Sequence, residues 1–152
     1  MLSTMTNTIF PSWLPVTALS FLLFLSTVLS VKSGWHRIAN RFPHKAQTDY
    51  QKFFFVRMSL GSGLFPVAYG GAVFVRLSPN GLGLSVIFLL RFLHPPIFIP
   101  WSAVTRCVRE KSSYYEFTRL SIRDEESELA FYGKPGESIY SSYVAKERNE
   151  KT

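Results

Sequence analysis

The segment 72–88 decides the fold class, because it reads as two strands joined by a tight turn: AVFVRL (72–77), SPNG (78–81) and LGLSVIF (82–88). Apolar residues recur at every second position in both runs, which is the period of a strand with one buried face. Asn80 and Gly81 adopt positive φ at low cost, as a short hairpin turn requires. The sequence therefore predicts an antiparallel hairpin in the middle of the chain.

Five more short runs rich in β-branched and aromatic residues flank this hairpin, separated by Gly, Pro and charged turns. A helix is expected from about Glu137 to Arg148, after a break at 133–136. This order predicts a small antiparallel barrel of the pleckstrin-homology-like (PH-like) kind over 46–148, with a tail at 149–152. The predicted strands are Lys52–Ser59, Ala72–Leu77, Leu82–Phe88, Ile97–Trp101, Val104–Arg109, Tyr115–Arg123 and Glu128–Tyr132.

An uncharged apolar run extends from Ile9 to Val31. About 20 helical residues cross the hydrocarbon core of a bilayer, so the run predicts a transmembrane helix over 9–31, preceded by a short external N-terminus at 1–8. A cleaved signal peptide is the alternative, but it needs a basic start, a shorter apolar stretch and a small-residue cleavage site. The sequence therefore favours a membrane anchor.

The charge is unevenly spread along the chain: 17 Lys and Arg face 10 Asp and Glu, for a net charge of +7. Six of these basic residues lie between Lys32 and Arg57, directly after the apolar run, where anionic headgroups would be. This position favours lipid over nucleic acid as the partner of the basic cluster. The positive-inside rule then predicts a single-pass protein of the cell (inner) membrane, with its C-terminal domain in the cytoplasm.

Segment 32–45 has the spacing of an amphipathic helix, since apolar residues recur at i, i+3, i+4 and i+7 until Pro43 ends the pattern. Two interpretations stay open: a basic juxtamembrane helix on the inner membrane surface, or a helix packed against the following domain. The residues predicted to lie at the membrane interface are Trp13, Lys32, Trp35, Arg37, Arg41 and Lys45.

The apolar stretch 82–100 is a candidate for a second membrane span, which would move the C-terminus outside. Arg91 near its middle opposes this, because an arginine at the centre of a transmembrane helix costs about 2.5–3.5 kcal/mol. His94 and the adjacent Pro95 and Pro96 oppose it as well. A hairpin followed by a bend is the preferred interpretation.

Clusters with catalytic or metal-binding spacing are missing from the sequence, so no catalytic residue, metal or cofactor is predicted. Cys107, the single cysteine, is expected to be a buried structural residue. His94 is expected to cap backbone groups before the bend. Three weaker signals are interpreted as structural or non-specific: an acidic turn (124–128), a glycine-rich loop (61–71), and a basic strip (Arg106, Arg109 and Lys111) near Tyr114 and Tyr115.

Three motifs occur in a fixed order: Gly34-Trp35 with Ile38-Ala39 and Phe42-Pro43; Gly81-Leu82-x-Leu84-Ser85; and His94-Pro95-Pro96 with Ile99-Pro100-Trp101-Ser102. In this order the chain resembles a set of uncharacterised single-pass bacterial membrane proteins. The part after the anchor is similar to bacterial PH-like domains. The resemblance implies a binding or scaffolding platform near a membrane, without an assigned enzymatic activity.

The sequence therefore predicts a membrane-anchored, non-enzymatic interaction or scaffolding module at the cytoplasmic membrane face. Its expected partners are the bilayer, with anionic headgroups, and a membrane protein, but neither a nucleic acid nor a specific small molecule. The alternative is an accessory subunit of a membrane enzyme or transporter complex, recognised through Thr17, Ser20, Ser26, Thr27 and Ser30 of the anchor. The predicted partner surface consists of His94, Pro95, Pro96 and Trp101.

Overall fold

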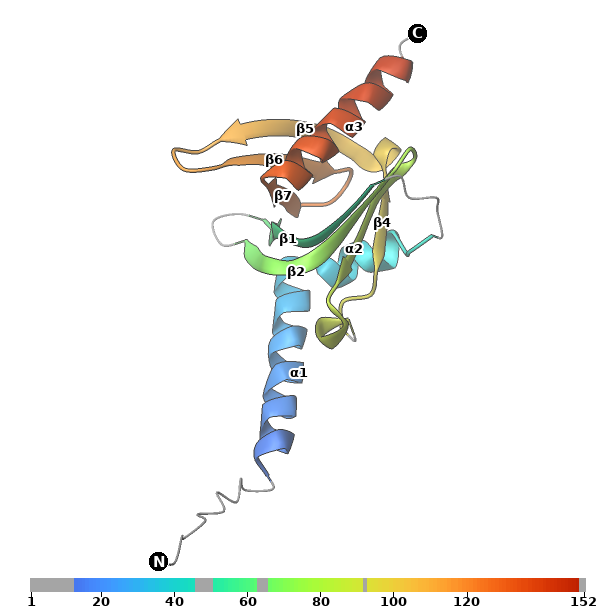
Figure 1. Ribbon diagram of the computed structural model, residues 1–152. Helices are drawn as coiled ribbons and strands as arrows, with labels where there is room; N and C mark the ends of the chain where they lie inside the picture. Colours follow the sequence, from blue (N-terminus) through green and yellow to red (C-terminus); the bar gives the residue numbers. More distant parts are fainter. Residues whose placement is uncertain (1–12, 46–50, 63–65, 92, 151–152) are drawn as a thin grey trace, which may run out of the picture.

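A computed structural model of the chain describes residues 13–45, 51–62, 66–91 and 93–150. Within these residues an apolar helix leads into a curled antiparallel sheet, which is followed by a C-terminal helix (Figure 1). The helices are α1 (Leu14–Ser33), α2 (Trp35–Arg41) and α3 (Lys134–Glu150), with 3₁₀ turns η1 (Phe88–Leu90) and η2 (Trp101–Ala103). The strands are β1 (Gln51–Gly61), β2 (Val67–Ser78), β3 (Gly81–Val86), β4 (Ile97–Pro100), β5 (Val104–Lys111), β6 (Glu116–Ile122) and β7 (Glu128–Tyr132).

The seven strands form one sheet in the order β4-β3-β2-β1-β7-β6-β5, and each neighbouring pair is antiparallel. The sheet curls into a half-barrel because β1 pairs with β2 along much of its length and with β7 over its last residues. A bulge in β1, where Phe55 has a φ of 55°, increases the local bend. The expected hairpin is confirmed, because Leu77 pairs with Leu82 and Ser78 with Gly81. The expected positive φ at Asn80 and Gly81 is wrong, since the turn consists of Pro79 and Asn80, Gly81 belongs to β3, and neither Asn80 nor Gly81 has a positive φ.

Several element boundaries differ from the sequence prediction, and the largest shift among the strands is at the start of β2. The segment 61–71 was expected to be a loop, but its second part belongs to β2, where Tyr69 pairs with Met58 and points into the core. Gly70 and Gly71 made this part of the strand difficult to predict, since glycine is uncommon in strand interiors. Residues 63–65, in the first part of the segment, lie outside the described residues.

Helix α3 begins at Lys134, three residues earlier than expected, and it continues to Glu150. Pro135 does not delay the start, because the first turn of a helix has N–H groups without intrahelical partners. The predicted tail at 149–152 therefore begins two residues too early. The helix covers one opening of the half-barrel, where Ile139 is fully buried and Tyr143 packs on the core.

The apolar stripe after α1 packs against the domain. Gly34 ends α1 in the left-handed conformation (φ 78°), so α2 starts in a new direction. The helix predicted over 32–45 is therefore shorter than expected, because residues 32 and 33 belong to α1 and α2 ends at Arg41. Trp35, Ile38 and Ala39 are buried in the core with the residues of the sheet. Of the two interpretations left open by the sequence, packing against the domain is the one observed.

Helix α1 is long and apolar enough to cross a membrane by length and composition, with a mean hydropathy of 2.1 over its most apolar window. A signal sequence near an N-terminus meets the same criteria. Most of its large apolar side chains that the structure describes are exposed, including Phe21 at 66% and Phe24 at 67%. Residues 1–12, which include the start of the predicted span, lie outside the described residues.

Trp13 and Trp35, both predicted to lie at the membrane interface, provide a test of the packing of α2 against the domain. Trp35 is 0% exposed and Trp13 is 62% exposed. We expect Trp35→Ala to lower the free energy of unfolding by about 3–5 kcal/mol, because it leaves a cavity in the core. Trp13→Ala is the matched control and should stay within about 0.5 kcal/mol of the wild type. Denaturant unfolding followed by circular dichroism measures both, and equal effects would contradict the buried position of Trp35.

Candidate functional site

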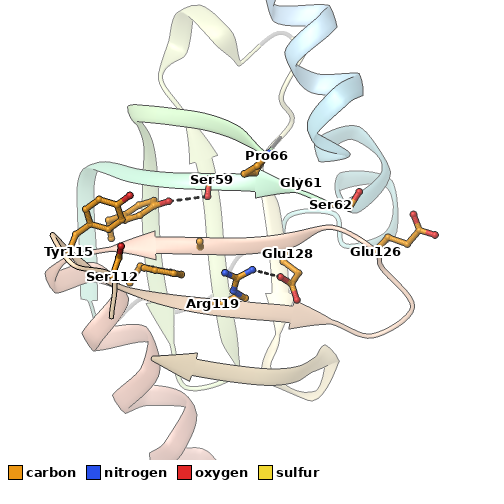
Figure 2. Close-up of a pocket in the computed structure, with 12 residues that line it drawn as sticks. Ser59, Gly61, Ser62, Pro66, Ser112, Tyr115, Arg119, Glu126 and Glu128 are labelled. Atoms are coloured by element: carbon orange, nitrogen blue, oxygen red, sulfur yellow. Dashed lines mark hydrogen bonds and ion pairs between the residues drawn. The ribbon is translucent and has the colours of Figure 1, made fainter. Parts of the chain in front are cut away.

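A groove of about 520 Å³ lies on the outer face of the sheet, over β1, β6 and β7 (Figure 2). Its position follows from the alternation of side chains along a strand. In β6, Leu120 and Ile122 point into the core, so Phe117 and Arg119 face outward. Strand β7 alternates in the same way, with its buried Phe131 on the opposite side from the groove.

Small residues make the floor of the groove. Ala130 of β7 pairs with Ser59 of β1 on one side and with Arg119 of β6 on the other. Gly61 follows on β1, opposite Glu128. Because three neighbouring outward positions carry little or no side chain, the surface is hollow between the larger residues around it.

One end of the groove is aromatic. The ring centroids of Tyr115 and Phe117 lie 5.5 and 5.7 Å from that of Tyr132. The hydroxyls of Tyr132 and Ser59 are 3.4 Å apart, within hydrogen-bond distance. Aromatic surface of this kind binds apolar or planar groups, and its ring faces attract cations.

The middle of the groove is charged. Arg119 donates hydrogen bonds to Glu128 (2.8 Å) and to Glu110 (3.0 Å), and Ser121 donates to Glu128 (3.0 Å). These bonds raise the pKa of Arg119, and the bond from Arg119 holds the pKa of Glu128 below its usual value. Figure 2 shows Tyr115 at one end, Glu126 at the other and the Arg119–Glu128 pair between them.

The groove offers a ligand aromatic, small polar and charged side chains. Glu128 accepts a charge-assisted hydrogen bond from Arg119, which holds the pKa of Glu128 below its usual value, and Glu110 accepts a second hydrogen bond from the same guanidinium. The charged side chains that line the groove are one arginine and two glutamates, Glu126 and Glu128, a sum of −1. An aromatic end, a hydrogen-bonding floor and this negative balance suit a ligand with an apolar and a basic group.

Two of the four residues of the predicted partner surface are buried in the protein. His94 is 0% exposed and Trp101 is 2% exposed, and Pro95 and Pro96 are half-buried. His94 does have its expected capping role, because its Nδ1 lies 3.1 Å from the carbonyl oxygen of Leu90. The prediction that His94 and Trp101 meet a partner is wrong, because both rings fill the domain.

His94 belongs to a buried cluster at the junction of α1 with the sheet. Its Nε2 lies 3.1 Å from the hydroxyl of Tyr69, which is 2.9 Å from the hydroxyl of Ser33. The indole of Trp35 packs on both rings and donates its N–H to the carbonyl of Pro95 (2.9 Å). The cluster is satisfied within the protein, so its role is structural.

Two of the basic residues predicted to meet lipid are engaged by the protein instead. Arg37 Nε lies 3.1 Å from Glu125, and Arg41 lies 2.9 Å from Asp124. The acidic turn is therefore not simply solvated, since the side chain of Glu125 is only 4% exposed. The pairing arises because α2 crosses the turn between β6 and β7, which no local sequence pattern predicts.

The other predicted interface residues, Trp13, Lys32 and Lys45, are exposed. No observation places them at a membrane, so their role there stays a prediction. Trp35, by contrast, is wrongly predicted, because its ring belongs to the core.

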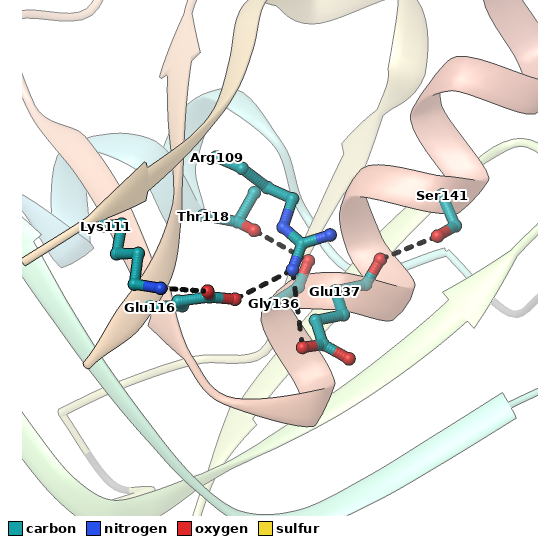
Figure 3. A network of polar contacts seen from close by, with 7 residues as sticks. All are labelled: Arg109, Lys111, Glu116, Thr118, Gly136, Glu137 and Ser141. Carbon is teal, nitrogen blue, oxygen red and sulfur yellow. Dashed lines mark hydrogen bonds and ion pairs between the residues drawn. The ribbon is translucent and has the colours of Figure 1, made fainter.

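The basic strip is largely neutralised (Figure 3). Arg109 lies between Glu116 (2.9 Å) and Glu137 of α3 (3.5 Å), and Lys111 lies 3.6 Å from Glu116. The Arg109–Glu137 pair, together with a hydrogen bond of 2.8 Å from Thr118 to the carbonyl of Gly136, connects the first turn of α3 to the sheet, whereas the pairs with Glu116 join β5 to β6. The strip is thus part of the attachment of the helix.

Cys107 is half-buried against the core, and burial raises the pKa of its thiol to about 12. The thiol therefore stays protonated, as expected for a structural cysteine. Within the described ranges of the chain, no group of three or more His, Cys, Asp and Glu residues could hold a metal ion.

Sequence reasoning missed the groove. Its members come from three strands and the turns beside them, and the pocket exists only where small residues of β1 and β7 meet. The outward alternation of Phe117 and Arg119 was the available signal, and Tyr115 was noted only as a neighbour of the basic strip.

Comparisons with known proteins show no family. No protein-family model matches the chain, and no curated protein sequence matches it. Thirteen chains of known structure match. One is the crystal structure of the C-terminal domain of an unknown protein from Leishmania infantum, with 10% identity and a TM-score of 0.45, covering 65% of this chain and 83% of that one. At this level of similarity, nothing about the present protein follows from it.

The ion pair in the groove predicts a pH dependence. Because the folded state lowers the pKa of Glu128, the pair stabilises the fold at neutral pH, and this contribution is lost as the pH falls below about 4.3 and through the lowered pKa. We expect Glu128→Gln to destabilise the protein at pH 7 by at most about 1 kcal/mol, since both partners are more than a third exposed.

The difference between Glu128→Gln and the wild type should shrink toward zero at low pH. Thermal unfolding of the detergent-solubilised protein at several pH values measures it, with Glu126→Gln as the control because residue 126 is exposed in the same groove. A difference that stays constant across the pH range would contradict the assignment.

Proposed function

We propose that this protein is a membrane-anchored, non-enzymatic interaction module, in which a PH-like domain at the cytoplasmic face of the cell membrane binds a protein segment in the outer groove. The groove is the observation that carries the proposal. Its volume of about 520 Å³ is within the range of binding pockets, and it joins an aromatic end to a charged middle. A segment with an apolar or aromatic side chain and a neighbouring basic one fits this lining.

Anchoring through α1 is supported by the exposure of its apolar side chains and by the way its last turns join the domain. Ser30 donates a hydrogen bond to the carbonyl of Leu93 (2.8 Å), and Ser33 is fully buried beside Tyr69. A cleaved signal peptide would take these contacts away from the mature domain. The packing therefore favours retention of the helix, and the Lys and Arg residues that follow it favour a cytoplasmic domain.

The PH-like assignment is the finer part of the proposal. Seven antiparallel strands that curl into a half-barrel, with a C-terminal helix on one opening, are the elements which that fold requires. The fold by itself does not name a ligand, so the binding role rests on the groove.

The alternative function, an accessory subunit recognised through α1, loses part of its basis. Ser26 and Ser30 are 4% and 3% exposed because they face the domain of the same chain. Only Thr17, Ser20 and Thr27 remain on exposed positions, and each donates its hydroxyl to the backbone of its own helix. A polar helix interface for another subunit is therefore smaller than the sequence suggested.

Co-purification from native membranes tests the proposal with two adjacent tyrosines. Tyr115 lines the groove and contacts Tyr132, whereas Tyr114 is 92% exposed and is not among the lining residues. We expect full-length protein in nanodiscs to retain a stoichiometric partner, identified by mass spectrometry, that is reduced at least about tenfold by Tyr115→Ala, the effect of losing about 1.4 kcal/mol. Tyr114→Ala should retain it.

A third variant separates the two functions. Thr17→Leu with Ser20→Leu and Thr27→Leu alters only exposed positions of α1. If this variant lost the partner while Tyr115→Ala kept it, the interaction-module proposal would be wrong and the accessory-subunit function would take its place. A domain expressed from residue 46 is unsuitable as a comparison, because it would lack the core residues Trp35, Ile38 and Ala39.

A further inference from the structure

The connection between β3 and β4 leaves the sheet and descends beside α1 (Figure 1). Its first part is the 3₁₀ turn η1, where Phe88 is 88% exposed. A phenylalanine exposed to this extent at the tip of a turn is unfavourable in water, since burial of its side chain would contribute about 1.5–3 kcal/mol. The turn therefore presents an apolar tip next to an apolar helix.

Two hydrogen bonds fix the height of this connection along α1. Ser30 donates to the carbonyl of Leu93, and Ser26 Oγ lies 3.4 Å from Nδ1 of His94. With a rise of 1.5 Å per residue, Ser30 and Ser26 lie about 3 and 9 Å before Lys32 along the helix axis. The connection thus lies alongside the last two turns of α1, on the apolar side of the first basic residue.

The length of α1 determines whether acyl chains or lipid headgroups surround the connection. If the hydrocarbon ended below the connection, at Ser26, the described part of α1 would supply only residues 14–25, about 18 Å of helix for a core of about 30 Å. Val31 would then stand outside the hydrocarbon although it is 71% exposed. A helix that spans the bilayer therefore needs the apolar layer to reach Ser30 or Val31, which places η1 within it.

The charges near the connection fit this depth. Arg91 is exposed at the end of η1, and Lys32 is exposed at the end of α1. Long basic side chains at this level extend their charged ends to lipid phosphates while their methylene stems stay in the apolar layer. A lone Arg91 opposes a complete span but suits a shallow insertion.

We propose that η1, with its exposed Phe88, inserts into the acyl chains of the leaflet beside α1 and forms a second membrane contact of the domain. The proposal rests on α1 spanning the bilayer. Two separate contacts resist rotation of the domain about the helix axis, so they define which face of the sheet points away from the membrane. Shallow insertion of about 5–10 Å is the depth expected for such an element.

Depth-dependent fluorescence quenching tests this insertion in the full-length protein. In a Cys107→Ala background, an environment-sensitive label is attached to Phe88→Cys and the protein is placed in nanodiscs of phosphatidylcholine and phosphatidylglycerol that carry bromine on their acyl chains. Phe24→Cys, 67% exposed on α1, reports whether the helix is in the bilayer. Tyr114→Cys, 92% exposed in the turn between β5 and β6, reports the quenching outside the membrane.

We expect labels at Phe88→Cys and Phe24→Cys to be quenched, with the first about 5–10 Å below the phosphates, and the label at Tyr114→Cys to be unaffected. Quenching at Phe24→Cys alone would overturn the insertion and leave the membrane anchor in place. Absence of quenching at both positions would overturn the insertion together with the anchor. The three labelled positions are exposed, so the fold should tolerate the changes there, and Cys107→Ala removes only a sulfur atom from a half-buried position.

Discussion

Trp35 holds together three parts of the chain that are far apart in the sequence. Its indole is fully buried, contacts the rings of Tyr69 in β2 and His94 before β4, and donates a hydrogen bond to the carbonyl of Pro95. The change of direction at Gly34 is what brings this ring into the sheet, and an added Cβ there would lie 2.7 Å from Ser127 Oγ. The junction of α1 with the domain is therefore a packed core rather than a flexible linker.

This junction determines how the remaining features are oriented. Because α1 and the sheet share buried contacts, the groove over β1, β6 and β7 and the turn at Phe88 hold fixed positions relative to the helix. Ion pairs from Arg37 and Arg41 to the turn between β6 and β7 add a second connection on the side of the groove. In the proposed membrane setting, a rigid helix and a shallow insertion together present the groove to partners in one orientation.

Much of the fold was predictable because it depends on local patterns. The alternation of Val73, Val75 and Leu77 and the turn at Pro79-Asn80 specify the central hairpin without help from other segments. The prediction of a membrane contact was wrong for Trp35, because the same side chain fits more than one environment. Trp35 suits a membrane surface as well as a protein interior, and Arg37 and Arg41 suit lipid phosphates as well as carboxylates of the protein. Only the packing of α2 against the sheet and the turn at Glu125 buries Trp35 and brings the two arginines to acidic partners. The groove escaped prediction for a related reason, since Ser59 and Ala130 are unremarkable until the register places them side by side.

The sequence by itself determined the apolar helix, the number of strands along the chain and the C-terminal helix. Hydrophobic period and turn chemistry, from which these elements are predicted, are properties of neighbouring residues. Only the tertiary structure decided which aromatic and charged side chains are buried, which ion pairs form and where the surface is hollow. These features depend on contacts between residues separated by tens of positions, as between Ser30 and Leu93 or Arg41 and Asp124. Such contacts leave no periodic trace in the chain, since each partner satisfies its own local pattern equally well without the other.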